Sequence, residues 1–366
     1  MEVCIIGLPK SGKTTIFNVL TRGKADIKAY ATSTLAPNIG VSKVPEPRLE
    51  VLDRIFHPKK VTPAEVKYVD IVGIAKDFGK GEGIGGQFLN YLSNADALLH
   101  VVRAFEDENV PHIDGTINPK RDIATMNLEL VFSDLAIIER RLKRLEDSLK
   151  GAKQSERDPI LKEQALLQRI KSELEKEAPI WQQSLSGDEI KSLANYQFLT
   201  AKPVLLIINV GEKQLTIDTS FEAEIRSSYT HTQFQVVALC GKLEMELTQL
   251  GDADGAEFRK ALGLTEPAVD RIIRLSYRLL GLISFFTIVS DELKAWTITK
   301  GMSAVKAAGK IHSDIEKGFI RAEVANFDDL VKYGSLAEAR KHGLLRLEGK
   351  NYIVQDGDII TFLFNI

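Results

Sequence analysis

Residues 7–14 read Gly-Leu-Pro-Lys-Ser-Gly-Lys-Thr, which places Gly7, Gly12, Lys13 and Thr14 in the spacing G-x-x-x-x-G-K-T/S. The glycines allow a tight turn in which backbone N–H groups point at a polyphosphate. The lysine supplies a positive charge to the β- and γ-phosphates, and the threonine hydroxyl is a ligand of the accompanying Mg²⁺. The motif predicts a nucleoside triphosphate site with Mg²⁺ as the cofactor. We expect the nucleotide to contact Leu8, Pro9, Lys10, Ser11, Gly12, Lys13, Thr14 and Thr15.

Two later positions carry residues that could sense the γ-phosphate. Thr34 lies in a polar loop after the first predicted helix, where nucleotide switches place a second Mg²⁺ ligand. Asp70 and Gly73 end an apolar strand in the order D-x-x-G. An aspartate there fits the acidic partner of Mg²⁺, and the glycine N–H could reach the γ-phosphate. Five glycines follow between Gly79 and Gly86, a composition typical of a segment that a ligand orders or releases.

Two loops at the ends of further apolar strands supply the remaining candidate contacts. The strand predicted over 203–208 runs into Asn-Val-Gly-Glu, and the strand predicted over 234–239 runs into Cys-Gly-Lys. The carboxyl ends of strands in an open α/β sheet form its ligand edge. We therefore add these residues to the nucleotide site: Asn209, Val210, Glu212, Cys240 and Gly241.

An alternation of strands and helices positions these loops. Apolar runs predict four strands besides the two above: 3–6, 39–44, 66–72 and 97–102. Helical periodicity begins after the phosphate loop at Thr15 and returns over 269–279. This alternation indicates an α/β nucleotide-binding domain with a mostly parallel sheet, formed by residues 1–127 and 197–282.

An insertion interrupts the alternation at residues 128–196. Its apolar residues recur in steps of 3 and 4, the seam of a coiled coil: Val131, Leu135, Ile138, Leu142, Leu145 and Leu149. A polar break over 151–159 precedes a second helix with Leu167, Ile170 and Leu174. We predict an antiparallel helical hairpin. It carries eleven Lys/Arg and ten Asp/Glu from Asp134 to Glu177, so a solvated arm and a nucleic-acid contact both stay open.

Residues 283–366 change to a pattern of short strands. These strands are predicted over 285–289, 296–299, 321–324, 352–354 and 359–364, with two short helices among them. The Asp and His residues of this region have no metal-ligand or catalytic spacing. We predict a separate α+β domain that serves as a binding module.

Composition limits the possible partners. The 366-residue chain has a formal net charge of -2, so nucleic acid or a membrane would have to bind a local patch. Cys4 and Cys240 lie in apolar runs without zinc-type spacing, which favours a reduced, cytosolic setting. No apolar span reaches 18 residues. We expect a cytoplasmic protein with no membrane partner.

Together these residues resemble the Obg-related P-loop GTPases, and within them the YchF/Obg-like ATPase family, over essentially the whole chain. The resemblance is carried by residues 7–15, Thr34, Pro37-Asn38, 70–73, 80–85, 209–212, 295–298 and 317–323. It implies a TGS domain with a β-grasp fold at the carboxyl end. It also implies a ribosome or ribosomal subunit as partner, with rRNA or tRNA contacts through the helical and TGS domains.

One departure from the GTPase pattern bears on the base. Ordinary GTPases read guanine with N-K-x-D, whose aspartate accepts hydrogen bonds from the N1–H and the exocyclic amine. Residues 209–212 lack the lysine, and Glu212 is one methylene longer than that aspartate. Asn209 can still pair with the N6/N7 edge of adenine. This agrees with the family's preference for ATP, whereas a permissive GTP site read by Glu212 stays open.

A second departure bears on the rate of hydrolysis. Ile74 follows Gly73 where many GTPases place the glutamine that orients the attacking water, so we expect slow hydrolysis. His112, in the loop after the strand predicted over 97–102, could reach this water. The alternative for His112 is an exposed loop histidine without a catalytic role.

Lys10 offers a further catalytic hypothesis. It stands where potassium-using G proteins of this loop shape have an asparagine, and its ammonium could stabilise charge in the transition state. The alternative is a lysine that points to solvent. The catalytic candidates are thus Lys10, Lys13, Thr34, Gly73 and His112.

The leading hypothesis is a slow ATPase that acts as a nucleotide-dependent switch. It would dock on ribosomal partners and regulate translation or the stress response. Two alternatives stay open, a conventional GTPase with a permissive base site and a non-catalytic, ATP-gated binding protein.

Overall fold

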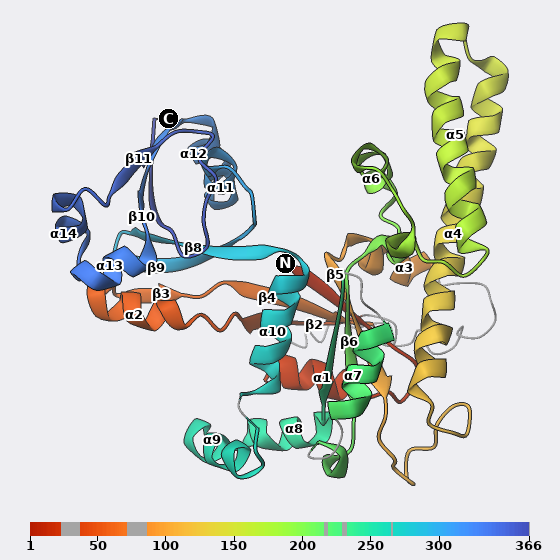
Figure 1. Ribbon diagram of the computed structural model, residues 1–366, viewed down its shortest axis with the longest axis horizontal. Helices are drawn as coiled ribbons and strands as arrows, with labels where there is room; N and C mark the ends of the chain where they lie inside the picture. Colours follow the sequence, from red (N-terminus) through yellow and green to blue (C-terminus); the bar gives the residue numbers. More distant parts are fainter. Residues whose placement is uncertain (23–36, 72–85, 216–218, 229–232, 265, 366) are drawn as a thin grey trace. The chain divides into compact units, whose positions relative to one another are not determined.

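Figure 1 shows the computed structural model, which describes residues 1–22, 37–71, 86–215, 219–228, 233–264 and 266–365. The chain forms two compact units. One unit contains residues 2–41 and 67–269, and the other contains Met1, 42–66 and 270–366. Among the described residues, no helix combines the length and the apolar character needed to cross a membrane.

The first unit is built on a six-stranded sheet in the order β2-β4-β1-β5-β6-β7. Its strands are β1 (Glu2–Ile6), β2 (Asn38–Lys43), β4 (Glu65–Asp70), β5 (Ala97–Arg103), β6 (Val204–Asn209) and β7 (Phe234–Leu239). The pairs from β4 through β7 are parallel, with Ile6 opposite His100 and Val102 opposite Ile208. Every residue of β5 and β6 is buried, as expected for parallel strands that are covered on both faces.

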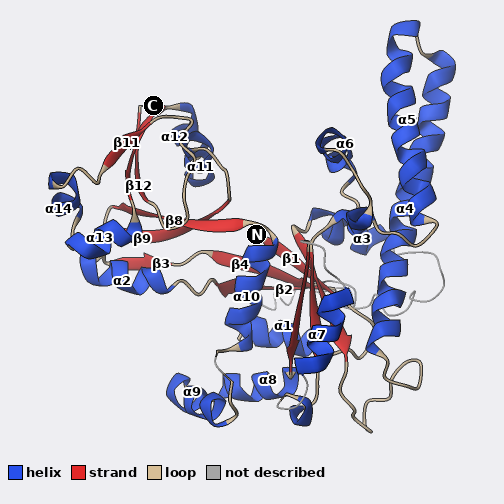
Figure 2. Cartoon of the chain, viewed as in Figure 1, coloured by secondary structure: helices blue, strands red, loops and turns tan. Residues whose placement is uncertain are grey.

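Helices α1 (Lys13–Leu20), α3 (Gly86–Asn94) and α7 (Thr219–Ser228) lie between strands of the sheet in the chain (Figure 2). α8 (Gly241–Gln249) follows β7, and α9 (Asp252–Ala261) follows α8 and contacts it. α1 buries Ile16, Phe17, Val19 and Leu20, and it contacts β1 and α8. Because the strands are parallel, their carboxyl ends share one edge of the sheet. The loops predicted to hold the nucleotide begin at that edge.

The predicted coiled-coil seam is confirmed in α4 (Pro119–Gly151) and α5 (Gln154–Leu174), which lie side by side (Figure 1). Val131, Ile138 and Leu145, one heptad apart, are at most 2% exposed. They share one apolar cluster with the residues predicted for the second arm: Leu167, Ile170 and Leu174. The insertion is therefore an antiparallel helical hairpin, as predicted.

Two boundaries of the hairpin differ from the prediction. α4 begins at Pro119 rather than at 128, because the Asn118 side chain caps it by accepting from the Arg121 N–H, 3.1 Å away. The break predicted over 151–159 is present but shorter, since only residues 152–153 separate α4 from α5, which begins at Gln154. Pro159 lies near the exposed start of α5, where a proline removes a single backbone hydrogen bond.

A buried carboxylate fixes the hairpin to the sheet. Asp134, on α4, is 0% exposed and accepts from the N–H groups of Leu199 and Thr200, both at 2.8 Å. It also accepts from the Thr200 hydroxyl at 2.7 Å. Leu199–Ala201 is a 3-10 turn that leads into β6, and α6 (Gly187–Leu193) precedes it. The lower part of α4 is thus tied directly to the start of a central strand.

The second unit has its own six-stranded sheet, in the order β11-β10-β12-β8-β9-β3. Its strands are β3 (Lys60–Thr62), β8 (Leu282–Val289), β9 (Glu292–Thr299), β10 (Phe319–Ala325), β11 (Arg346–Glu348) and β12 (Ile359–Phe364). Its helices are α2 (Pro47–Phe56), α10 (Ala268–Leu279), α11 (Ala304–Ile311), α12 (Ser313–Lys317), α13 (Phe327–Tyr333) and α14 (Leu336–Lys341). Antiparallel pairs dominate, and β12 runs parallel to β8.

The predicted architecture is confirmed: an α/β nucleotide domain with a mostly parallel sheet, an inserted helical hairpin and a carboxy-terminal α+β fold. Two details of the α+β prediction are wrong. Residues 352–354 form no strand, since only a single bridge joins Ser303 and Ile353. After β9 the described chain has four short helices instead of two, because helices of five to eight residues give little periodicity to read.

Residues 42–66 fold with the carboxy-terminal unit although they precede β4 in the chain. β3 pairs in parallel with β9, with Lys60 opposite Glu292. Arg48 of α2 forms an ion pair with Asp356 at 3.1 Å, and its guanidinium carbon lies 5.3 Å from the centre of the Phe286 ring. The domain limits predicted from the sequence, 1–127 and 197–282, assign these residues to the nucleotide domain. Whether a domain with those limits folds by itself stays a prediction.

Candidate functional site

Two glycines of the phosphate loop stand where a side chain would collide with the sheet. Gly7 and Gly12 have φ angles of 147° and 93°. A Cβ atom at Gly7 would lie 2.3 Å from the Val101 carbonyl oxygen on β5. One at Gly12 would lie 2.3 Å from Asn209 Nδ2 at the end of β6. The loop can lie against both strands only because these positions are glycine.

Lys13, the first residue of α1, closes the phosphate loop on itself. Its Nζ donates to the carbonyl oxygens of Gly7 and Leu8, both at 2.8 Å. Burial lowers the pKa of Lys13 to about 8, and the nearby Asp70 carboxylate offsets only part of this effect. The ammonium is therefore short of charged partners, and a polyphosphate could replace the two carbonyl groups.

Asp70, at the end of β4, lies beside the phosphate loop as predicted. Its Oδ2 accepts from the Thr14 hydroxyl at 3.1 Å and from the Asn38 amide at 3.4 Å. Its Oδ1 is buried and has no partner among the described residues. Burial raises the pKa of Asp70, while Thr14, Asn38 and Lys13 counteract the shift. An orphaned carboxylate oxygen beside a threonine hydroxyl suits Mg²⁺, which prefers oxygen ligands.

Asn209 holds three loops together. Its Nδ2 donates to the Ser11 carbonyl oxygen at 3.0 Å, and its Oδ1 accepts from the Gly241 N–H at 3.0 Å. A Cβ atom at Gly241 would lie 2.9 Å from Ile16 Cδ1, so a side chain there would have to displace the end of the Ile16 side chain. The sequence predicted that Asn209 reads the base. In the structure its amide instead forms hydrogen bonds to the phosphate loop and to the loop after β7. The second Nδ2 hydrogen remains available for a ligand.

Glu212 is not held in the position of a guanine-reading aspartate. Its side chain is 52% exposed and forms an ion pair with Lys242 at 3.4 Å. Val210 is 7% exposed and packs in the core of the first unit. A cavity of about 790 Å³ opens beside this loop, with Val210 and Glu212 in its lining. The side of this cavity formed by Val210 is therefore apolar, whereas the Glu212 carboxylate faces solvent.

Phe105 was not predicted as a site residue. A Cβ atom at Gly12 would lie 4.0 Å from its ring, and one at Gly211 would lie 3.8 Å from its Cβ. The guanidinium carbon of Arg103 lies 4.5 Å from the ring centre, and Arg103 Nε donates to the Phe105 carbonyl oxygen at 3.1 Å. The half-buried ring thus lies between the phosphate loop and the base loop. The sequence contained one indication of this role, namely an aromatic residue directly after a strand, at the edge of the sheet where ligands bind.

His112 is buried, so the alternative of an exposed loop histidine is wrong. Its side chain is 3% exposed, and Nε2 lies 2.9 Å from Asp122 Oδ2 on α4. His112 and Asp122 line a gap too small for a water molecule together with residues of the phosphate loop, among them Leu8, Pro9 and Ser11. The imidazole therefore lies beside that loop.

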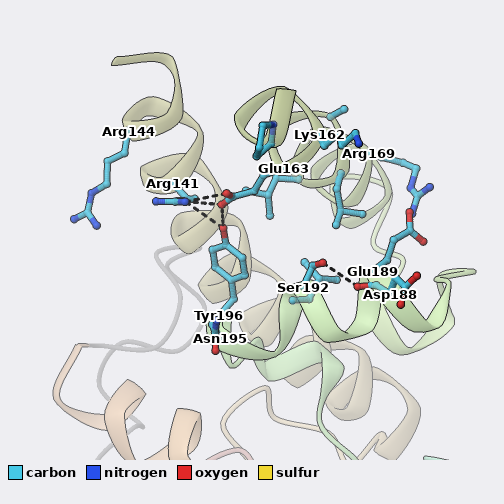
Figure 3. A pocket seen from close by; sticks show the side chains of 15 residues that line it. Arg141, Arg144, Lys162, Glu163, Arg169, Asp188, Glu189, Ser192, Asn195 and Tyr196 are labelled. Atoms are coloured by element: carbon cyan, nitrogen blue, oxygen red, sulfur yellow. Dashed lines mark hydrogen bonds and ion pairs between the residues drawn. The ribbon is translucent and has the colours of Figure 1, made fainter. Parts of the chain in front are cut away.

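A further cavity lies away from this site, between the hairpin and α6 (Figure 3). It measures about 1070 Å³ and contains two ion pairs, Arg141 with Glu163 at 2.6 Å and Arg169 with Glu189 at 2.7 Å. Arg144 and Lys162 make no ion pair with the other residues drawn in Figure 3. The lining therefore carries four cationic and three acidic side chains, an excess of one positive charge.

Two family models match this chain. One, for the carboxy-terminal region of the YchF GTPases and described as a protein of unknown function, matches residues 282–365. The other, described as a 50S ribosome-binding GTPase, matches residues 2–132. The "Ribosome-binding ATPase YchF" of Bacillus subtilis strain 168 is 40% identical over 99% of this chain and 98% of its own length. The chain belongs to the YchF family.

Other members of the YchF family agree in sequence and in fold. The protein of the same name from Escherichia coli O157:H7 is 39% identical, over 99% of this chain and 98% of its own length. The Schizosaccharomyces pombe YchF GTPase superimposes with a TM-score of 0.86 at 30% identity, over 99% of this chain and 97% of that one. The resemblance read from the sequence is therefore confirmed across the whole chain.

The remaining candidates of this YchF-family site are Lys10, Cys240 and the predicted residues of two segments that the structure does not describe. Lys10 is exposed and has a φ of 62°, with no hydrogen bond or ion pair to another described residue. The predictions for Thr34, Gly73, Ile74 and the glycine-rich segment fall outside the described residues. Cys240 is 3% exposed and immediately precedes α8, so its part in the site is the backbone turn that presents the Gly241 N–H.

Proposed function

We propose that this YchF-family protein binds ATP with Mg²⁺ and hydrolyses it slowly, as a nucleotide-dependent switch that works with the ribosome. One observation carries the proposal: a complete phosphate loop faces a base loop that lacks the guanine-reading pair. Lys13 and Asp70 flank the phosphate position, whereas Glu212 turns to Lys242 and solvent. The curated relatives named ribosome-binding ATPases support the same assignment.

The phosphate loop would bind the triphosphate mainly through its backbone. The N–H groups from Leu8 to Thr15 would surround the phosphates at the start of α1, and Lys13 would exchange its two carbonyl partners for the β- and γ-phosphates. Thr14, Thr34 and Asp70 are the residues proposed to hold Mg²⁺, directly or through water. When bound, Mg²⁺ neutralises charge on the phosphates.

The base loop would favour adenine over guanine. The free hydrogen of Asn209 Nδ2 can donate to adenine N7, and the Gly241 turn leaves the Cys240 backbone beside the base. The buried Val210 and the Phe105 ring offer apolar surface for stacking a purine. Because Glu212 is half exposed and paired, guanine would find no fixed carboxylate for its N1–H and amine. GTP should therefore bind more weakly than ATP.

Hydrolysis would be slow because no glutamine follows Gly73 to orient the water. In the reaction the water oxygen bonds to the γ-phosphorus, and the bond from that phosphorus to the bridging oxygen breaks. The electron pair stays on ADP, and the protons of the water go to inorganic phosphate and solvent. His112 is the residue we assign to the water, while Gly73 would donate its N–H to the γ-phosphate.

Lys10 is assigned a supporting part in the transition state. Its exposed ammonium lies on the phosphate loop and could swing to the β/γ bridge when ATP is bound. The wild type should then hydrolyse ATP equally well in sodium and in potassium, and Lys10→Asn should be slower in sodium and partly rescued by potassium. A wild type that potassium strongly stimulates would contradict this assignment.

A ribosome or ribosomal subunit is the proposed partner. The hairpin cavity, whose lining has one more cationic than acidic side chain, is the surface that we assign to an anionic partner such as rRNA or tRNA, and the carboxy-terminal unit could provide a second contact. The nucleotide would switch this docking and so regulate translation or the stress response. The cytoplasmic location expected from the sequence belongs to the same proposal.

Binding and turnover together test the proposed function. Titration of the full chain with ATP and GTP in the presence of Mg²⁺ should give tighter binding of ATP, and Lys13→Ala should abolish it. Lys43→Ala, an exposed lysine away from the loop, is the matched control and should bind as the wild type. Phosphate release should rise when ribosomes are added. Tighter binding of GTP would support the conventional GTPase, and turnover that no ribosomal fraction stimulates would support the ATP-gated binder.

A further inference from the structure

His112 and Asp122 form a buried pair, and the part assigned to it below rests on the proposed function, in which His112 acts on the attacking water. The side chains of both residues are 3% exposed. His112 Nε2 and Asp122 Oδ2 are 2.9 Å apart, a hydrogen bond that is isolated from bulk water. The hydrogen-bond partners of a buried imidazole fix its orientation and its tautomer, and therefore which ring nitrogen can accept a hydrogen bond.

The two ring nitrogens of His112 have different partners. The backbone N–H of Asp114 lies 3.1 Å from Nδ1 and can only donate, and Arg121 Nη2, at 3.4 Å, is also a donor. Nδ1 must therefore carry a lone pair. The hydrogen of a neutral ring then lies on Nε2, where the Asp122 carboxylate accepts it. All the contacts of the ring agree on this one tautomer.

Asp122 is itself held firmly. Its Oδ1 accepts from Arg121 Nε at 3.0 Å and from Arg121 Nη2 at 2.8 Å, so the carboxylate has a fixed orientation and a compensating charge. It lies in the first turn of α4, where its N–H bonds to the Asn118 carbonyl oxygen at 3.0 Å. Three turns later Asp134 ties the same helix to the start of β6. The acceptor for Nε2 is thus part of a rigid element.

We propose that Asp122 is a positioning residue that holds His112 as the Nε2–H tautomer and so reserves the Nδ1 lone pair for the attacking water. The water would replace the Asp114 N–H as the donor to Nδ1, one hydrogen bond for another. Its oxygen would then be free to approach the γ-phosphorus. His112 and Asp122 line the same narrow gap as Leu8, Pro9 and Ser11, so the pair lies beside the phosphate loop.

A bound metal ion is the competing explanation for this cluster. Ligand atoms of His112, Asp114 and Asp122 lie within 4.8 Å of one another. However, the Arg121 guanidinium already occupies the space between the two carboxylates, at 2.8 Å from Asp122 and 3.4 Å from Asp114. A second cation there would be repelled, so the geometry favours the tautomer-fixing pair.

The experiment measures the tautomer and the rate in the same proteins. Long-range ¹H–¹⁵N spectra of the imidazoles, with His112→Ala to assign the signal, should report Nε2–H in the wild type. In Asp122→Asn the remaining carbonyl oxygen stays with Arg121, so the amide would oppose a hydrogen on Nε2 while the Asp114 N–H still opposes one on Nδ1. The ring should therefore lose its single tautomer, and the signal should change to a mixture of the two forms. Asp107→Asn, an exposed carboxyl in the same connection, is the matched control and should change neither reading.

The rates complete the test. Asp122→Asn should slow single-turnover ATP hydrolysis by at least about tenfold, with ATP affinity retained as evidence of folding. Added to His112→Ala, it should cause no further loss. Nδ1–H in the wild type, an unchanged tautomer in Asp122→Asn, or an additive double variant would overturn the positioning assignment. A His112→Ala protein as fast as the wild type would instead remove His112 from the proposed function, and this inference with it.

Discussion

Raising the pH from 7 to 9 should weaken ATP binding about tenfold through Lys13 alone. Burial lowers the pKa of Lys13 to about 8, and Asp70 offsets only part of the shift. At pH 9 about one free molecule in eleven then carries the ammonium that the phosphates require. A lysine with an ordinary pKa would remain charged in about 96% of the molecules, and its contribution to affinity would barely change.

The sign of the effect follows from the charge of the ligand. Bound phosphates favour the ammonium, so the pKa of Lys13 rises when the complex forms, and binding above pH 8 takes up a proton. The dissociation constant should therefore rise about tenfold per pH unit above the pKa of the free protein, or about 1.4 kcal/mol per unit. Below that pKa the contribution of Lys13 is constant.

Calorimetric titration with a non-hydrolysable ATP analogue measures both quantities. Repeating it from pH 7 to pH 9.5, in two buffers of different ionisation enthalpy, gives the affinity and the number of protons taken up. Lys13→Arg is the matched control, because a guanidinium stays charged over this range and its affinity, even if weaker, should not change with pH. A wild-type affinity that stays constant from pH 7 to 9 without proton uptake would refute the reasoning.

Three further predictions follow from the site and the fold. Gly12→Ala should lower ATP affinity by at least about tenfold, because its methyl group would lie 2.3 Å from Asn209 Nδ2 at a φ of 93°; an unchanged affinity in a titration would count against this loop geometry. Asp134→Ala should lower the free energy of unfolding by about 3 kcal/mol, as three buried donors lose their acceptor; denaturant unfolding measures it, and a loss below about 1 kcal/mol would contradict the anchor. Val210→Lys combined with Glu212→Asp should shift the ratio of ATP to GTP affinity toward GTP, and an unchanged ratio would show that other residues select the base.

The phosphate site could be predicted from the sequence because its geometry is local. Gly7, Gly12 and Lys13 lie within one turn of chain between a strand and a helix, and their spacing alone determines that turn. Asp70 could be added because strand order in a parallel sheet brings its carboxyl end to the same edge. The coiled-coil seam was read correctly for the same reason, since each contact follows from a fixed helical period.

His112 and Asn209 show where this reasoning fails. A histidine among the charged residues of a loop is expected to be exposed. His112 is instead buried, with a hydrogen bond to the Asp122 carboxylate ten residues further on, and the Arg121 guanidinium compensates the charge of that carboxylate. Asn209 was assigned to the base by analogy with the guanine-reading motif. Its partners Ser11 and Gly241 lie 198 and 32 residues away in the chain, so no local pattern could show that its amide joins two loops.

Residues 42–66 fold with the carboxy-terminal unit, which matters for how the chain can be divided. The strands on either side belong to the nucleotide sheet, so the sequence placed everything between them there. Only contacts at long range assign the segment elsewhere, such as the Thr62 hydroxyl bond to Glu292, 230 residues away, and the Arg48 ion pair with Asp356. The chain thus passes between the two units at 41–42 and at 66–67 as well as at 269–270. A truncation after residue 283 would remove the partners of α2 and β3, so a single cut cannot isolate the nucleotide unit intact.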